Sequence, residues 1–189
     1  MTEIHPLEPF IPHNTQLLML GSFPPPRKRW CMDFYYPNFQ NDMWRIFGIL
    51  FFGEKEHFIT PEKCFDKEKI IAFLQEKGIA IYDTATEVKR LQDNASDKFL
   101  EVVRPTPIRT LLQAMPACRA IVTTGQKATD LLMEQMGTHA PKVGQFTLST
   151  HNGRPLYLYR MPSSSRAYPL SLDKKAAFYA EMFKELNLL

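Results

Sequence analysis

The chain has 189 residues, of which 44% are hydrophobic and 23% are charged. This length and balance predict one globular domain over residues 1–189 and exclude an intrinsically disordered chain. No apolar run approaches the roughly 20 residues that a membrane-spanning helix needs, and no signal peptide is recognisable at the start. We therefore expect a cytoplasmic protein with no membrane partner.

Charge and cysteine usage narrow the expectations further. The formal net charge is +3, which permits binding to phosphates but does not require it. The three cysteines, Cys31, Cys64 and Cys118, are far apart in the sequence and form no Cys-x-x-Cys pair. This spacing does not fit a zinc ribbon or an iron–sulfur cluster, so we expect free thiols, no metal and no cofactor. Nothing in the sequence demands a dimer, and a monomer is expected.

The predicted elements alternate between short apolar strands and helices of about ten residues. Glycines mark several of the boundaries, as Gly21 does after the first apolar run and Gly53 after the first helical pattern. In chain order we expect a strand over 16–20, a helix over 42–52, a short helical stretch capped by Thr60, a helix over 70–77, a strand over 79–82, a weak helix over 93–103, a helix over 108–115, a strand over 120–123, a helix over 128–136, a strand over 155–160 and a helix over 171–187.

This alternation predicts an α/β fold, a three-layer αβα sandwich around a central, mostly parallel sheet of four strands. Ligands of such folds bind outside the carboxyl ends of the strands. We therefore expect the functional site in the loops after the four strands. These loops cover residues 21–40, 83–90, 124–127 and 161–169.

The loop after the first strand contains two segments whose residues could bind a ligand. Gly21 permits a tight turn and close backbone approach, and three prolines stiffen the loop, so its exposed N–H groups could recognise an oxyanion or a base carbonyl. The later part, residues 35–44, is rich in aromatic rings, which can stack on bases, and in amides, which can read base edges. An alternative stays open: Asn41 could simply cap the following helix, and the aromatic rings could belong to the core.

The loop after the last strand is small and polar. Its serine hydroxyls could bind phosphates, and its single long cation, Arg166, could reach into a groove. The alternative is an ordinary solvated loop.

Taken together, these segments resemble the uracil-DNA glycosylase superfamily. The resemblance rests on a strand ending in Gly21-x-x-Pro24, a helix opened by an aromatic-x-x-x-x-Asn-x-x-Trp segment, and a Met161-Pro162-Ser-Ser-Ser loop after the last strand. The mismatch-specific and hypoxanthine-DNA glycosylases are the most similar branches. The strand over 79–82, which ends at Asp83, also has a counterpart there.

The resemblance implies roles for individual residues. The implied catalytic residues are Asn41 and Ser22. Asn41, at the start of the helix, matches the catalytic Asn of the hypoxanthine branch, and Ser22 stands at the other catalytic position, where that branch also has a Ser. The N–H groups around Ser22 and Phe23 could stabilise the anionic base. Tyr36 would stack on the flipped base. The implied base-binding residues are Gly21, Phe23, Pro24, Tyr36, Asn38 and Thr124. The implied DNA-binding residues are Pro162, Ser163, Ser164 and Ser165, which would pinch the backbone, and Arg166, which would wedge into the duplex.

The implied activity is removal of a deaminated base, uracil or hypoxanthine, from DNA during base excision repair. Enzymes of this kind flip the target nucleotide out of the helix before they act on it. No lysine or N-terminal amine is an obvious nucleophile in the sequence. We therefore expect a monofunctional glycosylase that hydrolyses the N-glycosidic bond without a Schiff base, and whose partner is DNA containing a damaged base.

Three positions depart from the family pattern and keep a catalytically silent protein open as an alternative. A hydrolase of free nucleosides or nucleotides is a further alternative. Met161 stands where efficient uracil-removing enzymes have His, and Thr124 replaces a base-reading Asn; Ser22 stands where several branches have a catalytic Asn or Asp. These departures suit a catalytically silent nucleic-acid-binding protein on the same scaffold. A hydrolase of free nucleosides or nucleotides would need acidic residues to hold a ribose, and Asp33, Asp42 and Asp83 are the ones near the expected site.

Overall fold

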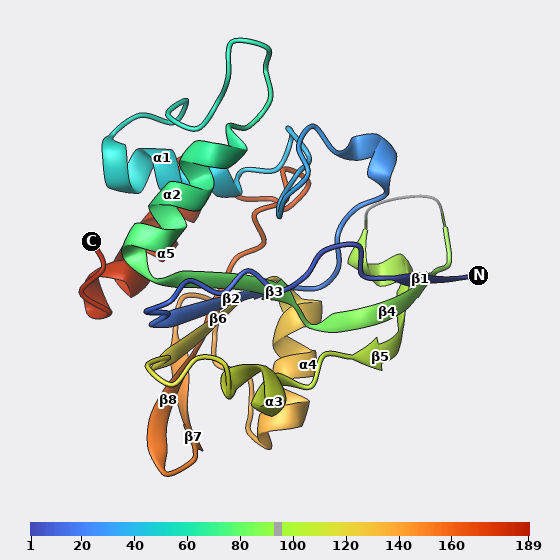
Figure 1. Cartoon of the computed structure of the whole chain (residues 1–189), viewed down its shortest axis with the longest axis vertical. Coiled ribbons are helices and arrows are strands. Elements are labelled where there is room, and N and C mark those ends of the chain that lie inside the picture. Colours follow the sequence, from blue (N-terminus) through green and yellow to red (C-terminus); the bar gives the residue numbers. More distant parts are fainter. Residues whose placement is uncertain (93–95) are drawn as a thin grey trace.

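The computed structural model describes residues 1–92 and 96–189 and contains two β-sheets with helices packed around them (Figure 1). The larger sheet has the strand order β3-β2-β6-β8-β7. Neighbouring strands are parallel from β3 to β8, whereas β7 pairs antiparallel with β8. The strands are β2 (Leu17–Gly21), β3 (Ile79–Asp83), β6 (Ala120–Thr124), β7 (Phe146–His151) and β8 (Arg154–Met161).

The four strands expected from apolar runs are all present, within one or two residues of their predicted ends. Every residue of β2, β3 and β6 is buried, because helices cover both faces of the sheet. Strands buried on both sides are continuously apolar, and these three could therefore be predicted from apolar runs without an alternating pattern. The predicted α/β class is confirmed.

The prediction of four strands was wrong, because β7 extends the sheet by an antiparallel edge strand. β7 and β8 form a hairpin around Asn152 and Gly153, which have positive φ angles of 50° and 76°. An Asn-Gly pair with both residues in the left-handed region is the preferred two-residue hairpin turn. The residues of β7 are mostly polar and alternate between exposed and half-buried, so the segment lacks the apolar run that identified the other strands.

A second, antiparallel sheet of three short strands has the order β1-β4-β5. Its strands are β1 (Thr2–Ile4), β4 (Ala85–Arg90) and β5 (Leu100–Pro105). The expected weak helix over 93–103 is therefore wrong where it overlaps β5, and its residues 93–95 lie outside the described part of the chain. Leu100 and Val102 point inward on alternate positions and pack with Val88, so the relevant period is two rather than 3.6.

Helices cover the two faces of the larger sheet in the predicted three layers (Figure 1). One face carries α1 (Met43–Phe52), α2 (Lys67–Lys77) and α5 (Leu172–Glu185); the other carries α3 (Ile108–Leu112) and α4 (Gln126–Met136). Left-handed glycines follow α1, α2 and α4, as expected for helix ends. In the described ranges, no helix is both long enough and apolar enough to cross a membrane.

The helix expected from Thr60 is absent. Residues 60–63 form a turn, closed by an isolated bridge between Ile59 and Phe65. The Oδ1 atom of Asp66 accepts a hydrogen bond from the Lys69 N–H at 3.1 Å, so Asp66 caps the next helix instead. Thr60 and the following Pro satisfy the cap-and-proline pattern, but no helix forms there. The chain also has two short 3₁₀ turns, η1 (Arg27–Arg29) and η2 (Asp97–Phe99), at segments without this pattern.

Candidate active site

The carboxyl ends of β2, β3 and β6 bring three predicted loops to one edge of the sheet. Gly21, the last residue of β2, is in register with Asp83, the last residue of β3. Thr124, the last residue of β6, is in register with Met161, the last residue of β8. We call the residues that gather at this edge the strand-end cluster; they are Gly21 and the polar residues Ser22, Tyr36, Asp83, Asp97 and Thr124.

Tyr36 lies at the centre of the strand-end cluster. Its hydroxyl is 3.0 Å from Thr124 Oγ1, and its ring meets Trp44 edge to face at 5.9 Å between centroids. A φ of 50° places its backbone in the left-handed region, which is strained for a large side chain and is held here by the surrounding packing. Burial, and then the charge of Asp83, raise the pKa of Tyr36 above its usual value, so the hydroxyl remains protonated.

Gly21 provides the space beside this hydroxyl. A Cβ atom on Gly21 would lie 2.7 Å from Asp83 Oδ1 and 3.4 Å from the Tyr36 hydroxyl. The first distance is too short for any side chain, and the Asp83 carboxylate is held in place by its own hydrogen bond. Glycine is therefore required here for close approach to the Asp83 carboxylate, which is one of the reasons predicted from the sequence.

A histidine near the N-terminus holds Asp83. His5 Nε2 is 2.7 Å from Asp83 Oδ2, and the Leu7 N–H donates to His5 Nδ1 at 3.1 Å. Because Nδ1 accepts a hydrogen bond, Nε2 carries the proton and donates to the carboxylate. Sequence reasoning missed His5, since 78 residues separate it from Asp83 and no local motif connects them.

A second carboxylate enters the cluster from the 3₁₀ turn η2, which lies between β4 and β5 of the small sheet. The Ser22 hydroxyl donates to Asp97 Oδ1 at 2.6 Å, and Asp97 Oδ2 would be 4.0 Å from a Cβ atom on Gly125. Burial raises the pKa of Asp97 above its usual value, while the Ser22 hydrogen bond and the charge of Lys127 act in the opposite direction. Asp97 was not predicted as a site residue, because its segment was expected to be a weak helix away from the strand ends.

Phe23 and Pro24 follow Ser22 and contact the small sheet and the N-terminal segment. The Phe23 ring meets His5 edge to face at 5.2 Å and packs against the apolar residues of the small sheet. The Pro24 carbonyl accepts a hydrogen bond from Arg90 at 3.0 Å. Both residues thus connect the two sheets, and their predicted base-binding role stays a prediction.

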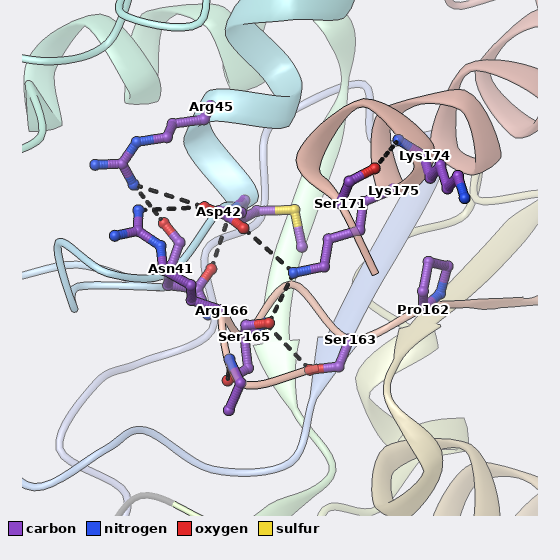
Figure 2. A network of polar contacts seen from close by, with 12 residues as sticks. Asn41, Asp42, Arg45, Pro162, Ser163, Ser165, Arg166, Ser171, Lys174 and Lys175 are labelled. Carbon is purple, nitrogen blue, oxygen red and sulfur yellow. Dashed lines mark hydrogen bonds and ion pairs between the residues drawn. The ribbon is translucent and has the colours of Figure 1, made fainter. Parts of the chain in front are cut away.

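Asn41 lies immediately before α1 (Figure 2). Its Oδ1 accepts a hydrogen bond from the Met43 N–H at 2.9 Å, which is the capping arrangement considered as the alternative to catalysis. Asn38 supports the same turn, since its Oδ1 accepts from the Gln40 N–H and its carbonyl accepts from the Asn41 N–H. These bonds fix the carboxamide oxygen of Asn41 in one position; they do not test a catalytic role.

The late loop, residues 162–169, joins the two halves of the predicted site. On one side, Ser163 Cβ would be 3.8 Å from a Cβ atom on Gly125, close to Asp97. On the other side, the carbonyl of Ser164 accepts a hydrogen bond from the Asp42 N–H at 2.9 Å. The loop therefore lies beside Gly125, the residue that follows β6, and is bonded to the start of α1.

Several polar groups of the loop are paired within the protein. The Ser163 hydroxyl accepts from the Ser165 N–H at 3.1 Å, and the Pro162 carbonyl accepts from the buried Tyr179 hydroxyl at 2.9 Å. Ser164 is 2% exposed, so its hydroxyl faces the protein rather than solvent, whereas Ser163 and Ser165 are half-buried.

A buried ion pair anchors the loop to α5 (Figure 2). Lys175, which is 1% exposed, donates to Asp42 Oδ2 at 3.2 Å and to the Ser165 carbonyl at 2.8 Å. Arg166 Nη2 reaches Asp42 Oδ1 at 3.4 Å, although over half of the Arg166 side chain is exposed. Lys175 was expected only as part of the last helix, and a lysine this deeply buried needs a partner carboxylate, which the sequence alone could not identify.

No group of three or more His, Cys, Asp or Glu side chains in residues 1–92 and 96–189 could hold a metal ion.

Among known proteins, the similarity of this chain lies in its fold. No protein-family model matches the sequence, and no curated protein matches it significantly. One similar solved structure is the solution NMR structure of a Methanosarcina acetivorans protein that is provisionally described as a uracil DNA glycosylase. The two chains are 22% identical, the alignment covers 99% of each, and the TM-score is 0.66. At this identity the likeness establishes a shared fold over nearly the whole length of both chains.

Proposed function

We propose that this chain is a monofunctional DNA glycosylase that hydrolyses the N-glycosidic bond of a deaminated base, uracil or hypoxanthine, flipped out of DNA. The observation that carries the proposal is the strand-end cluster, where the Tyr36–Thr124 hydroxyl pair and two carboxylates meet at the carboxyl edge of the sheet, next to the late loop. This is where α/β sheets bind ligands. The shared fold with a protein described as a uracil DNA glycosylase supports the same reaction class.

The cleaved bond leaves positive charge on the sugar and negative charge on the departing base. In the proposed step, the oxygen of a water molecule bonds to the sugar carbon while the carbon–nitrogen bond breaks and its electron pair leaves with the base. The proton released by the water goes to the Asp97 carboxylate, which Ser22 orients through its 2.6 Å hydrogen bond. The N–H groups of Ser22 and Phe23 stabilise the anionic base.

Asn41 is the residue that we propose positions the attacking water. Its Oδ1 is held by the Met43 N–H, so the carboxamide is fixed in orientation, and the remaining lone pair of Oδ1 can accept from a water. In this proposal Asn41 orients the nucleophile and Asp97 removes its proton. The two roles are separable by mutation, because the side chains come from different elements.

The geometry of the lysines supports hydrolysis by water rather than attack by an amine. Lys127 Nζ donates to the Leu100 carbonyl at 2.6 Å, and Lys175 Nζ is paired with Asp42 and buried. An amine that forms a Schiff base must be deprotonated and must reach the sugar. Neither amine is placed to do so, and we propose that no covalent intermediate forms and that the DNA strand stays intact.

DNA contact is assigned to the late loop. Pro162, Ser163, Ser164 and Ser165 carry the proposed contacts with the backbone. The donors are the N–H groups of Ser163 and Ser164 and the half-buried hydroxyls of Ser163 and Ser165, and Pro162, which has no N–H, contributes only its ring. Arg166 has to leave Asp42 before it can enter the duplex. A partly exposed ion pair at 3.4 Å is weak enough for that exchange.

A catalytically silent nucleic-acid-binding protein is the second candidate. The observation that favours it is that the Asn41 oxygen and the Ser22 hydroxyl are already engaged, by Met43 and Asp97 respectively. In that case the scaffold would bind DNA without cutting the glycosidic bond.

Oligonucleotides distinguish the two candidates. Single- and double-stranded substrates that carry uracil, hypoxanthine or xanthine are incubated with the protein and then treated with alkali. We expect strand breaks at the lesion only after alkali, which is the signature of a monofunctional glycosylase. Breaks before alkali would contradict monofunctional hydrolysis. No breaks with any lesion, combined with salt-sensitive binding, would overturn the enzyme proposal in favour of the silent binder.

A further inference from the structure

A pocket of about 720 Å³ lies between the start of α1, the segment around residues 55–63 and the start of α5. It is distinct from the strand-end cluster, since none of the six cluster residues lines it. The late loop separates the two: Ser163 is next to Gly125, whereas Arg166 lines this pocket. We call it the cationic pocket, because five of its lining side chains are basic: Arg45, Lys55, Lys63, Arg166 and Lys175.

Positive charge in the cationic pocket exceeds what its own carboxylates can neutralise. The acidic lining residues are Asp42 and Glu56. Asp42 is shared by three of the cations, at 3.2 Å from Lys175, 3.4 Å from Arg166 and 4.0 Å from Arg45. A carboxylate divided among three cations leaves the pocket electropositive, and a concave surface lined by one sign of charge concentrates its field.

Arg45 is held in this repulsive position by its neighbours. Its guanidinium lies 4.6 Å from the centroid of the Phe39 ring, and its Nη1 donates to the carbonyls of Phe39 and Asn41 at 2.7 and 2.9 Å. Burial, and next the positive charge of Arg166, lower the pKa of Arg45. Two guanidinium groups that repel each other and open onto the same cavity would both be stabilised by an anion placed between them.

The start of α5 adds hydrogen-bond donors to the same cavity. Ser171, the N-cap, and Leu172, the first helical residue, both line the pocket. The first N–H groups of a helix have no partner within the helix, and a helix of 14 residues favours negative charge at this end. The cations and the helix start thus converge on one volume.

We propose that the cationic pocket binds a phosphate group, as a phosphodiester of the DNA strand whose base occupies the strand-end cluster or as a free phosphate. Guanidinium groups bind phosphate oxygens in a bidentate manner, and the Thr60 hydroxyl at the rim adds a neutral donor. The DNA form of the proposal rests on the proposed function. It places one backbone contact on the far side of the late loop from the excised base, and adds Lys55 and Lys63, which sequence reasoning did not consider, to the DNA-binding surface.

The test uses the double substitution Lys55→Gln, Lys63→Gln, which removes two exposed cations of the pocket and leaves the buried network intact. The matched control is Lys67→Gln, Lys69→Gln, which removes the same charge from exposed positions of α2 outside the pocket. Binding of an undamaged duplex is measured by fluorescence anisotropy over a range of salt concentrations, so the readout does not depend on base excision.

If the pocket holds a DNA phosphate, the slope of log affinity against log salt falls by about one unit in the pocket variant and stays unchanged in the control. A free phosphate is tested separately by titrating inorganic phosphate and following the amide NMR signals of Ser171 and Leu172. Signals that shift in the wild type but not in the pocket variant, with unchanged DNA slopes, would assign the site to free phosphate. The proposal would be overturned if the pocket variant and the control both kept the wild-type slope and phosphate shifted neither amide signal in the wild type. This outcome does not depend on whether the protein excises bases.

Discussion

The strand-end cluster and the cationic pocket lie on the two sides of the late loop and differ in chemistry. The strand-end cluster combines hydroxyl groups with the carboxylates of Asp83 and Asp97. The cationic pocket collects lysines and arginines around the shared carboxylate of Asp42. The first composition can move a proton and bind neutral polar edges, and the second can attract a phosphate. Under the proposed function, this difference would separate bond cleavage from backbone binding, and we expect substitutions on the two sides to affect different measured quantities.

The largest effect is expected from Asp97→Asn in the strand-end cluster. The amide keeps the hydrogen bond with Ser22 but cannot accept the proton of the water, so the excision rate should fall by about a thousandfold, or roughly 4 kcal/mol of transition-state stabilisation. DNA affinity should remain at the wild-type value. Single-turnover excision and anisotropy measure the two quantities, and Asp130→Asn, at an exposed position of α4, is the matched control. An unchanged excision rate would remove Asp97 from the mechanism.

The second-largest effect is expected on the free energy of unfolding, from a substitution in the cationic pocket. Lys175→Met removes the buried partner of Asp42 and should lower the free energy of unfolding by about 3 kcal/mol, because a carboxylate stays behind in a buried position. Urea denaturation measures this loss. Lys174→Met, one residue earlier and exposed, should change stability by less than about 0.5 kcal/mol.

A double variant sharpens the same prediction. In Asp42→Asn, Lys175→Met the buried charge is absent, so part of the lost stability should return. A double variant as unstable as the sum of the two single variants would show that the Asp42–Lys175 contact contributes nothing as a pair.

Asn41→Ala tests whether the start of α1 belongs to the catalytic side. Loss of the hydrogen bond to the Met43 N–H should cost about 1 kcal/mol of stability. If Asn41 also orients the water, the excision rate should fall by about a hundredfold beyond that, measured at a temperature where the variant is fully folded. Asn41→Asp keeps the capping oxygen and is the matched comparison. Wild-type excision by Asn41→Ala would leave Asn41 with its capping role alone.

The smallest expected effect is on the shape of the pH–rate profile. Burial raises the pKa of Asp97, and Asp97 must be ionised to accept a proton. The rate should therefore fall on the acidic side as Asp97 becomes protonated, at a higher pH than for an unperturbed aspartate. The same raised pKa means that ionised Asp97 disfavours the folded state, so its contribution to stability is lost as the pH rises. This acidic limb should disappear from the residual activity of Asp97→Asn, and a limb that persists would belong to another group.

Some of the site could be predicted from the sequence. Apolar runs located β2, β3 and β6, and the rule that ligands bind at strand ends put Gly21, Asp83 and Thr124 in one region. Tyr36 was predicted beside them and its hydroxyl does contact Thr124. Their roles in base binding remain predictions.

Other parts were predicted wrongly or not at all. The segment that contributes Asp97 was expected to be helical, and β4 and β7 were not expected, because strands with one exposed face have a weaker apolar signal than buried ones. Asn152-Gly153 was a local turn signal for the β7–β8 hairpin that could have been used.

The sequence by itself determined the features that depend on neighbours a few residues apart, which are the buried strands and the glycine-terminated helices. These result from hydrophobic period, capping and backbone freedom, which act over one or two turns of chain. The tertiary structure alone decided the pairings that give the site its chemistry. His5 meets Asp83 across 78 residues, Ser22 meets Asp97 across 75, and Lys175 meets Asp42 across 133. Such contacts depend on the order of strands in the sheet and on which helix covers which face, and no local pattern in the chain encodes that order.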